Sequence, residues 1–351
     1  MKRCVFLVAV FSFGLTLTVA VVSLAEAAAT SSFLTEYPVP GSPHHVTVEA
    51  PGVVWFTLPD QNAIGRLTVT STVEYEVITY TIPTDDSEPY DLDYANGAIW
   101  FTERTGNHIG RLDPTTGGVD EFPVPTLDSR PTGIDAVPGS PAQVWFTEQS
   151  GNNLGQLVVT STIDYTFSEY PLPHADAEPQ DICFENASSV WFTAPGEKCI
   201  GNLNPSHWDP DDAFKLISDP GLQRPWAIQV DGSGYPWFTD VSGNQIGIFF
   251  PQTIGDFRLY SLPSADGKPY DLATAQGFVW FTEYDGNRVG RRSTSPSAAI
   301  TEFGIPSAQP LGLAVDTRGH VWIAESATGK IAEWQPPYFH FVFLPLALKN
   351  Q

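Results

Sequence analysis

The sequence is poor in residues that mark several common classes of protein. Its 351 residues contain 17 lysines and arginines against 40 aspartates and glutamates, three cysteines and one methionine. The shortage of basic residues argues against binding to nucleic acid or to an anionic lipid surface, because both carry the same sign of charge as this chain. A cationic ligand or a metal ion is easier to accommodate on long-range electrostatic grounds.

Recognisable catalytic motifs are also missing. The sequence has no nucleophile elbow, no glycine-rich phosphate loop and no His/Cys cluster with zinc-type spacing. No long apolar helical pattern follows the N-terminus. Any chemistry therefore has to come from side chains that the fold brings together.

The N-terminus has the pattern of a secretory signal peptide. Lys2 and Arg3 precede an apolar run over residues 5–24, and small residues follow up to Ala29. We therefore predict a signal peptide at 1–29 and a mature chain that is secreted or held at the cell surface, without stable insertion into a membrane. An uncleaved N-terminal anchor is the alternative, since the run has about the length of a bilayer span.

A repeat occupies most of the remaining chain. Tryptophans recur at intervals of 42 to 46 residues, most often within Trp-Phe-Thr-Glu or a close variant: Trp55, Trp100, Trp145, Trp191, Trp237, Trp280 and Trp322. This period is typical of a four-stranded propeller blade, and apolar runs around each tryptophan indicate strands buried between stacked blades. We predict an all-β protein over residues 30–335, a seven-bladed β-propeller of four-stranded antiparallel blades.

One unit shows how a blade is built. Pro89 opens a first strand, residues 98–102 form a second, 107–112 a third and 119–124 a fourth. Gly-Asn pairs before the third strand, such as Gly106-Asn107, supply a turn.

The outer strands predict how the ring closes. Residues 35–40 resemble the outer strand at 168–173 but precede the first tryptophan, whereas the last unit ends at 331–334 without an outer strand of its own. The N-terminal strand is thus expected to complete the last blade, which removes an open sheet edge and favours a monomer. The apolar segment 336–351 is interpreted as a strap or loose end, or as a terminal sorting signal.

Two cysteines, Cys183 and Cys199, remain after the predicted signal peptide. A disulfide is permitted outside the cell. In the predicted blade they lie on strands separated by a third strand, roughly twice the ~4.8 Å strand spacing apart, which exceeds normal disulfide reach. The sequence is compatible with a disulfide bridge and with two buried free thiols.

Loops at the start of each first strand and the end of each second strand should converge on one mouth of the central channel. Just after the repeat proline stand His44, Tyr90, Thr132, Gln180, Trp226, Tyr270 and Leu311. Three residues beyond each tryptophan stand Leu58, Glu103, Glu148, Ala194, Asp240, Glu283 and Glu325. The five carboxylates of this second set would form a ring able to hold a hard cation. The alternative is a structural role, either capping turn amides or pairing with Arg66, Arg111 or Arg291.

Departures from the repeat are the more informative positions. His44 and His45 form the only adjacent histidine pair, and a histidine titrates near neutral pH, which suits either binding or proton transfer. Trp226, preceded by Arg224 and Pro225, offers a surface for stacking on a flat or sugar-like ligand, with plain burial as the alternative.

Two units carry a resemblance to a known family. Val144-Trp145-Phe146-Thr147-Glu148 with Gly151-Asn152, and Val279-Trp280-Phe281-Thr282-Glu283 with Gly286-Asn287, resemble the repeat of the streptogramin B lyases, the virginiamycin B lyase family. The resemblance extends over roughly residues 33–334. It implies a seven-bladed propeller that opens a cyclic depsipeptide at its ester link by elimination, with Mg²⁺ at the mouth. In that chemistry a base removes a proton next to a carbonyl while the metal stabilises the enolate.

The family's site spans two adjacent blades, and the resemblance assigns roles here only at blades 1 and 2. The family has a His after one repeat proline, a Glu-Pro-His in the next blade whose His is the base, and a Glu soon after Trp-Phe. Here His44 is the first histidine, Glu88-Pro89-Tyr90 replaces Glu-Pro-His, and Glu103 lies one place before the family's Glu. The candidate catalytic residues are His44 and Tyr90. The candidate ligands are Glu88 and Glu103, for Mg²⁺ or alternatively Ca²⁺.

These observations lead to a main hypothesis and alternatives. The main one is a secreted propeller that binds a small-molecule or peptide-like ligand at the mouth without lyase chemistry. Its candidate ligand-binding residues are His45, Glu148, Trp226, Asp240, Glu283 and Glu325. The alternative is a Mg²⁺-dependent lyase. A calcium-dependent lactonase is a third reading, disfavoured because that type has six blades.

Overall fold

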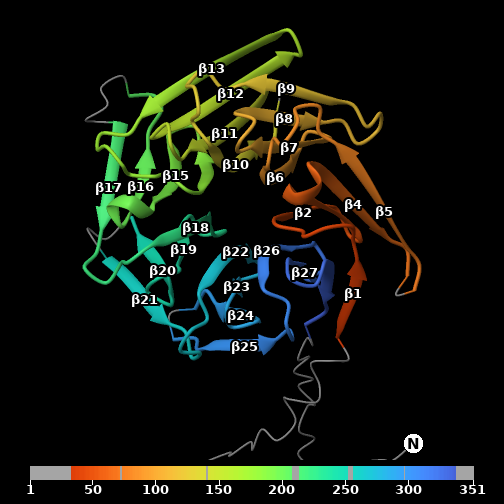
Figure 1. Cartoon of the computed structure of the whole chain (residues 1–351). Coiled ribbons are helices and arrows are strands. Elements are labelled where there is room, and N and C mark those ends of the chain that lie inside the picture. Colours follow the sequence, from red (N-terminus) through yellow and green to blue (C-terminus); the bar gives the residue numbers. More distant parts are fainter. Residues whose placement is uncertain are drawn as a thin grey trace, which may run out of the picture.

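The computed structural model describes residues 33–71, 73–139, 141–207, 213–251, 256–295 and 297–336. These segments form seven four-stranded antiparallel sheets, arranged as blades around a central axis (Figure 1). The predicted all-β seven-bladed propeller is confirmed. The predicted signal peptide and residues 337–351 of the apolar tail lie outside the described residues.

Blades 1 to 6 each use four consecutive strands, from β2–β5 to β22–β25, and blade 7 combines β26, β27, β28 and β1. The strands are β1 (Leu34–Pro38), β2 (Val46–Ala50), β3 (Val53–Leu58), β4 (Ala63–Val69), β5 (Tyr75–Thr81), β6 (Pro89–Ala95), β7 (Ala98–Glu103), β8 (His108–Leu112), β9 (Val119–Pro123), β10 (Pro131–Val137), β11 (Ala142–Glu148), β12 (Asn153–Ser161), β13 (Asp164–Pro171), β14 (Ile182–Asn186), β15 (Ser189–Ala194), β16 (Cys199–Leu203), β17 (Phe214–Ser218), β18 (Pro225–Val230), β19 (Pro236–Asp240), β20 (Gln245–Phe250), β21 (Asp256–Ser261), β22 (Pro269–Ala275), β23 (Phe278–Glu283), β24 (Arg288–Ser293), β25 (Ile300–Gly304), β26 (Pro310–Val315), β27 (Val321–Glu325) and β28 (Lys330–Trp334). Short 3₁₀ turns follow two second strands, η2 (Pro59–Gln61) and η3 (Pro195–Glu197).

The repeated Trp-Phe pair explains the packing of each blade. All seven tryptophans are buried, with at most 3% of their surface exposed. The phenylalanine after each tryptophan lies opposite a glycine of the third strand, as Phe101 does with Gly110. A Cβ on Gly110 would lie 2.1 Å from Phe101 Cζ, so the ring occupies the space that a side chain would need. In blade 7 both partners change together, and Ile323 faces Ala332.

Arginines of the third strands pack on these tryptophans. The guanidinium carbons of Arg66, Arg111 and Arg291 lie 5.1–5.7 Å from the ring centres of Trp55, Trp100 and Trp280. Among the described residues, the ion pairs of Arg66 and Arg111 are to Glu49 and Asp120. Pairing of these arginines with the glutamates after Trp-Phe-Thr was therefore a wrong expectation, because cation–π contact with the tryptophan holds them instead.

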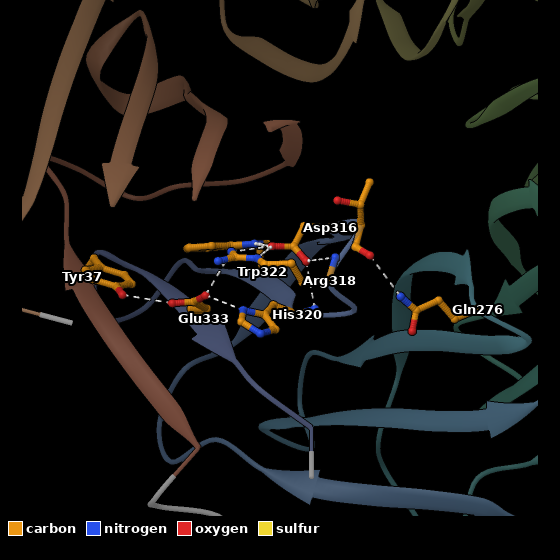
Figure 2. A network of polar contacts seen from close by, with 8 residues as sticks. Tyr37, Gln276, Asp316, Arg318, His320, Trp322 and Glu333 are labelled. Carbon is orange, nitrogen blue, oxygen red and sulfur yellow. Dashed lines mark hydrogen bonds and ion pairs between the residues drawn. The ribbon is translucent and has the colours of Figure 1, made fainter. Parts of the chain in front are cut away.

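The N-terminal strand closes the ring, as predicted. In Figure 1 the red strand β1 lies beside the blue C-terminal strands, and it pairs with β28 from Leu34↔Trp334 to Pro38↔Lys330. The Tyr37 hydroxyl donates to Glu333 at 3.0 Å, and Glu333 also contacts His320 at 2.7 Å (Figure 2). Side chains thus fasten the strand that the backbone pairing adds.

The Gly-Asn turns do more than reverse the chain. Asn107 has a φ of 58°, in the left-handed region that asparagine tolerates. Its side-chain amide also donates to the carbonyls of Val124 and Thr126, and its oxygen accepts from Ser129. The turn therefore ties down the linker that leads to the next blade.

Two further features bear on the sequence predictions. Cys183 on β14 and Cys199 on β16 are free thiols, which agrees with the reading without a bridge. Within the described residues, no helix has the length and apolarity needed to cross a membrane.

Candidate binding site at the channel mouth

The first strands of the blades line a central cavity of about 330 Å³. Side chains that directly follow the repeat proline lie at its mouth end, and four of them line the cavity: Tyr90, Gln180, Trp226 and Tyr270. Of the seven side chains predicted to converge on the mouth, His44, Thr132 and Leu311 are not among the residues that line this cavity. His45 lines the same cavity, whereas Glu88 and Glu103 do not.

A polar network crosses the channel at this level. The hydroxyls of Tyr90 and Tyr270 are 3.0 Å apart, and the Gln180 amide donates to the Tyr90 hydroxyl at 3.1 Å. These residues belong to blades 2, 6 and 4, so the network links three blades that are not neighbours. Burial, followed by the nearby Tyr270, raises the pKa of Tyr90 well above its usual value. At neutral pH Tyr90 is therefore a protonated phenol.

The histidine pair lies against this network. His45 Nδ1 is 2.8 Å from the Tyr90 carbonyl oxygen and 2.9 Å from His44 Nδ1. A carbonyl can only accept, so a ring N–H of the histidine pair donates to the Tyr90 oxygen. Burial is the main cause that lowers the pKa of both histidines, so both are neutral at pH 7.

Arg104 occupies the region predicted to hold a metal. Its guanidinium forms an ion pair with Glu88 and lies 4.7 Å from the centre of the Tyr90 ring. The other oxygen of Glu88 accepts from the Thr105 hydroxyl at 2.6 Å. Although burial opposes the shift, hydrogen bonds from Arg104 and Thr105 lower the pKa of Glu88. Glu88 is thus an ionised carboxylate with its counter-cation already in place.

Glu103 lies in a different environment. Its side chain is fully buried at the end of β7, beside Glu121 of the outer strand β9, and His108 Nδ1 is 3.7 Å from its Oε2. Burial, followed by Glu121, raises its pKa to about 8. The two carboxyl groups predicted as metal ligands therefore have separate partners. In the described part of the chain, no three His, Cys, Asp or Glu side chains are arranged to hold a metal ion.

The other carboxylates of the predicted acidic ring are also not brought together at the channel. Glu148, Asp240, Glu283 and Glu325 are fully buried in their own blades, and none of them lines the central cavity. Asp240 accepts from the backbone amides of Gln223, Arg224 and Gly243, which is the capping role considered above. These four side chains therefore do not form an acidic ring around the channel.

Three of these glutamates repeat the arrangement of Glu103. Each buried second-strand glutamate lies near a less buried glutamate of the outer strand: Glu103 near Glu121, Glu148 near Glu169, Glu283 near Glu302 and Glu325 near Glu36. Burial is the main cause that raises the pKa of Glu148 to about 7 and of Glu283 to about 8. Three blades lack the second-strand glutamate and have Leu58, Ala194 or Asp240 there instead. Their outer strands also lack the glutamate and have Thr79, Leu216 or Leu259 at the corresponding position. The sequence contained this covariation between units, and reading the two positions together would have revealed it.

Sequence reasoning also missed the acidic lining of the channel. Asp91, Asp93, Asp135, Asp181 and Asp271 line the cavity below the mouth residues. They join neighbouring blades: Asp91 accepts from the Ile134 amide at 3.0 Å, and Asp271 from the Leu313 amide at 2.7 Å. Burial raises the pKa of Asp91 to about 7 and of Asp271 to about 6. The repeated Tyr-Asp-Leu at 90–92 and 270–272 was the available signal.

Comparisons with known proteins agree with this architecture. The model of the virginiamycin B lyase family matches residues 33–334. A streptogramin B lyase structure is 28% identical with a TM-score of 0.76, covering 86% of this chain and 97% of that one. Virginiamycin B lyase from Staphylococcus aureus is also 28% identical with a TM-score of 0.76, covering 87% and 99%. A catalytically inactive His-to-Ala variant of that enzyme with quinupristin is 26% identical, with the same TM-score and coverage. The search of curated proteins finds no match.

Proposed function

Because the chain belongs to the virginiamycin B lyase family, we propose that it binds a small-molecule or peptide-like ligand at the channel mouth without the elimination reaction. One observation carries this proposal: Arg104 pairs with Glu88 and covers the Tyr90 ring at the place where the resemblance puts the metal and the base. The mouth therefore keeps the family's fold, but Arg104 and Tyr90 stand where the resemblance places a metal ligand and the base.

The residues present do not fit Mg²⁺ or Ca²⁺. Arg104 stands one place after Glu103, at the position where the family has its second glutamate. A fixed guanidinium there neutralises Glu88 and repels a second cation, and Arg is effectively always charged. Glu103 is buried beside Glu121, whereas Glu88 contacts Arg104 and Thr105, so the two carboxyl groups have different neighbours. We therefore assign no metal to the mouth.

Tyr90 does not supply the base of the family's reaction. Tyr90 replaces the family's catalytic histidine, and its raised pKa keeps the proton on the phenol. His44 is neutral, and its Nδ1 lies 2.9 Å from His45 Nδ1, so the histidine pair can hydrogen-bond a ligand. The solved relative with quinupristin is a catalytically inactive variant that lost a histidine, which supports treating binding and chemistry as separable.

The test uses quinupristin as the probe, with and without Mg²⁺. We expect calorimetric binding to the wild-type chain, and no linear product of equal mass by mass spectrometry. A linear product that disappears in Tyr90→Phe would instead support the lyase alternative. If the wild type binds neither quinupristin nor the linear peptides described below, the binding proposal is wrong.

We also propose that this binding takes place outside the cell. The support is the basic, apolar and small-residue pattern of residues 1–29. Expression of the full chain in a secreting host followed by N-terminal sequencing tests it: a mature N-terminus near residue 30 is expected, and an intact Lys2-Arg3 terminus on cell-bound protein would favour the anchor.

A further inference from the structure

We infer that the ligand of the mouth is an organic anion, a carboxylate joined to an aromatic group, recognised by Arg224 together with the Trp226–Tyr270–Tyr284 surface. This inference rests on the proposed binding function and names the class of molecule bound. The whole chain is strongly acidic, which disfavours an anionic ligand on long-range electrostatic grounds. The inference therefore depends on the basic residues close to the mouth.

An aromatic surface extends across two blades at the mouth. The Trp226 and Tyr270 rings are 5.4 Å apart, and the Tyr270 and Tyr284 rings are 6.2 Å apart. Trp226 and Tyr270 are only partly buried, unlike the repeat tryptophans, so part of their ring surface is open to a ligand. Offset stacking on such rings stabilises a flat group by its area and by quadrupole interactions.

Basic residues stand at several repeat positions near the mouth. Among residues just before the repeat prolines are Arg130, Arg224 and Lys268, and Arg104 lies at the end of a neighbouring second strand. Arg104 and Lys268 form ion pairs with Glu88 and Asp285. Arg130 and Arg224 are exposed. Arg130 acts electrostatically on Glu88, whereas the ion pairs found in the described segments do not include Arg224. Glu88 and Glu178 stand at the same repeat position in blades 2 and 4, so the inference rests on Arg224, whose guanidinium lies on the Trp226 ring.

Arg224 is held ready to meet a carboxylate. Its backbone amide is fixed by Asp240 at 2.6 Å, and its guanidinium carbon lies 4.7 Å from the centre of the Trp226 ring. A stacked guanidinium keeps its edge N–H groups available, and that fork matches a carboxylate with two parallel hydrogen bonds. One residue pair thus offers a charge contact and a flat surface side by side.

The aspartates of the channel do not prevent an anionic ligand from binding at the mouth. The Tyr90–Tyr270–Gln180 network lies at the mouth end of the cavity, and the aspartates farther along it already accept backbone amides. Raised pKa values of Asp91 and Asp271 also reduce their negative charge near neutral pH. A ligand that approaches Trp226 therefore meets the Arg224 guanidinium and the neutral donors of this network.

The experiment compares two probes that differ only in charge, N-acetyl-Phe-Phe with a free C-terminal carboxylate and its C-terminal amide. Calorimetry on the full mature chain at low salt is expected to show the acid binding about tenfold more tightly. Arg224→Gln should bring the acid to the affinity of the amide and remove its salt dependence. Trp226→Leu should weaken both probes.

Arg258→Gln is the matched control, because Arg258 also stacks on an aromatic ring, 5.0 Å from Phe250, but on the outer strand β21. It should change neither probe. Equal binding of acid and amide would overturn the anion inference and leave mouth binding intact. If quinupristin binds but neither peptide does, the anion inference is again overturned and the proposed binding function stands. Failure of all three probes would overturn both proposals.

Discussion

Replacing Glu103 by glutamine tests what the buried glutamates of the second strands do to the stability of the fold. Glu103 is fully buried, and burial followed by Glu121 raises its pKa from 4.5 to about 8. Between those two values the unfolded chain has released a proton that the folded chain still holds, so stability falls as the pH rises. Its contribution is intact below the unfolded pKa and is lost on approaching the folded pKa.

The magnitude follows from the same shift. One such group changes the free energy of unfolding by about 1.4 kcal/mol for each pH unit within this window. Between about pH 5 and pH 8, and allowing for the flattening near the folded pKa, Glu103 alone removes roughly 3 kcal/mol. Glutamine keeps the size and hydrogen-bonding capacity of the neutral acid but does not titrate.

The assay is guanidinium unfolding of the wild type and Glu103→Gln at a series of pH values. The two proteins should have similar stability near pH 5, and the variant should be more stable by roughly 3 kcal/mol near pH 8. Glu178→Gln, at an exposed position, is the control and should follow the wild type. Parallel curves for wild type and Glu103→Gln would refute the reasoning.

Three further perturbations test the fold and the mouth. Gly155→Ala places a Cβ 2.0 Å from Phe146 Cζ and should cost about 1–3 kcal/mol in chemical unfolding, with part recovered by adding Phe146→Ile; no recovery would contradict the ring-over-glycine account. Tyr90→Phe removes the hydroxyl that Gln180 bonds and should cost about 1–2 kcal/mol, without altering circular dichroism; an unchanged melting temperature would show that the network is not stabilising. Deletion of residues 33–38 opens the ring and should produce oligomers in light scattering, whereas a stable monomer would argue against closure by β1.

The repeat made the fold readable from the sequence. Trp100 and its six counterparts set the number of blades, and the displaced segment at 35–40 placed the closing strand, because both are patterns of spacing. The site was only partly readable. Spacing identified the ring that contains Tyr90 and Trp226, but it could not say which way a side chain at the end of a strand turns.

Glu103 and its counterparts show this limit. The sequence places them at the end of the second strand, and there a side chain can face the channel or its own outer strand. Packing against Glu121 decides between these, and that contact joins residues from different strands. Likewise, the role of Arg104 depends on a pairing with Glu88 that proximity in space creates.

Closure by β1 also orders events during synthesis. Blades 1 to 6 are continuous in sequence, so each has all its strands as soon as it emerges. The seventh must wait, because Tyr37 and Glu333 are 296 positions apart. Until the C-terminal strands appear, β1 has no partner, and blades 1 to 6 would leave the apolar faces of blades 1 and 6 uncovered. We expect this incomplete ring to be the aggregation-prone stage of synthesis, and the β1–β28 pairing to be an early site of local opening in the finished molecule.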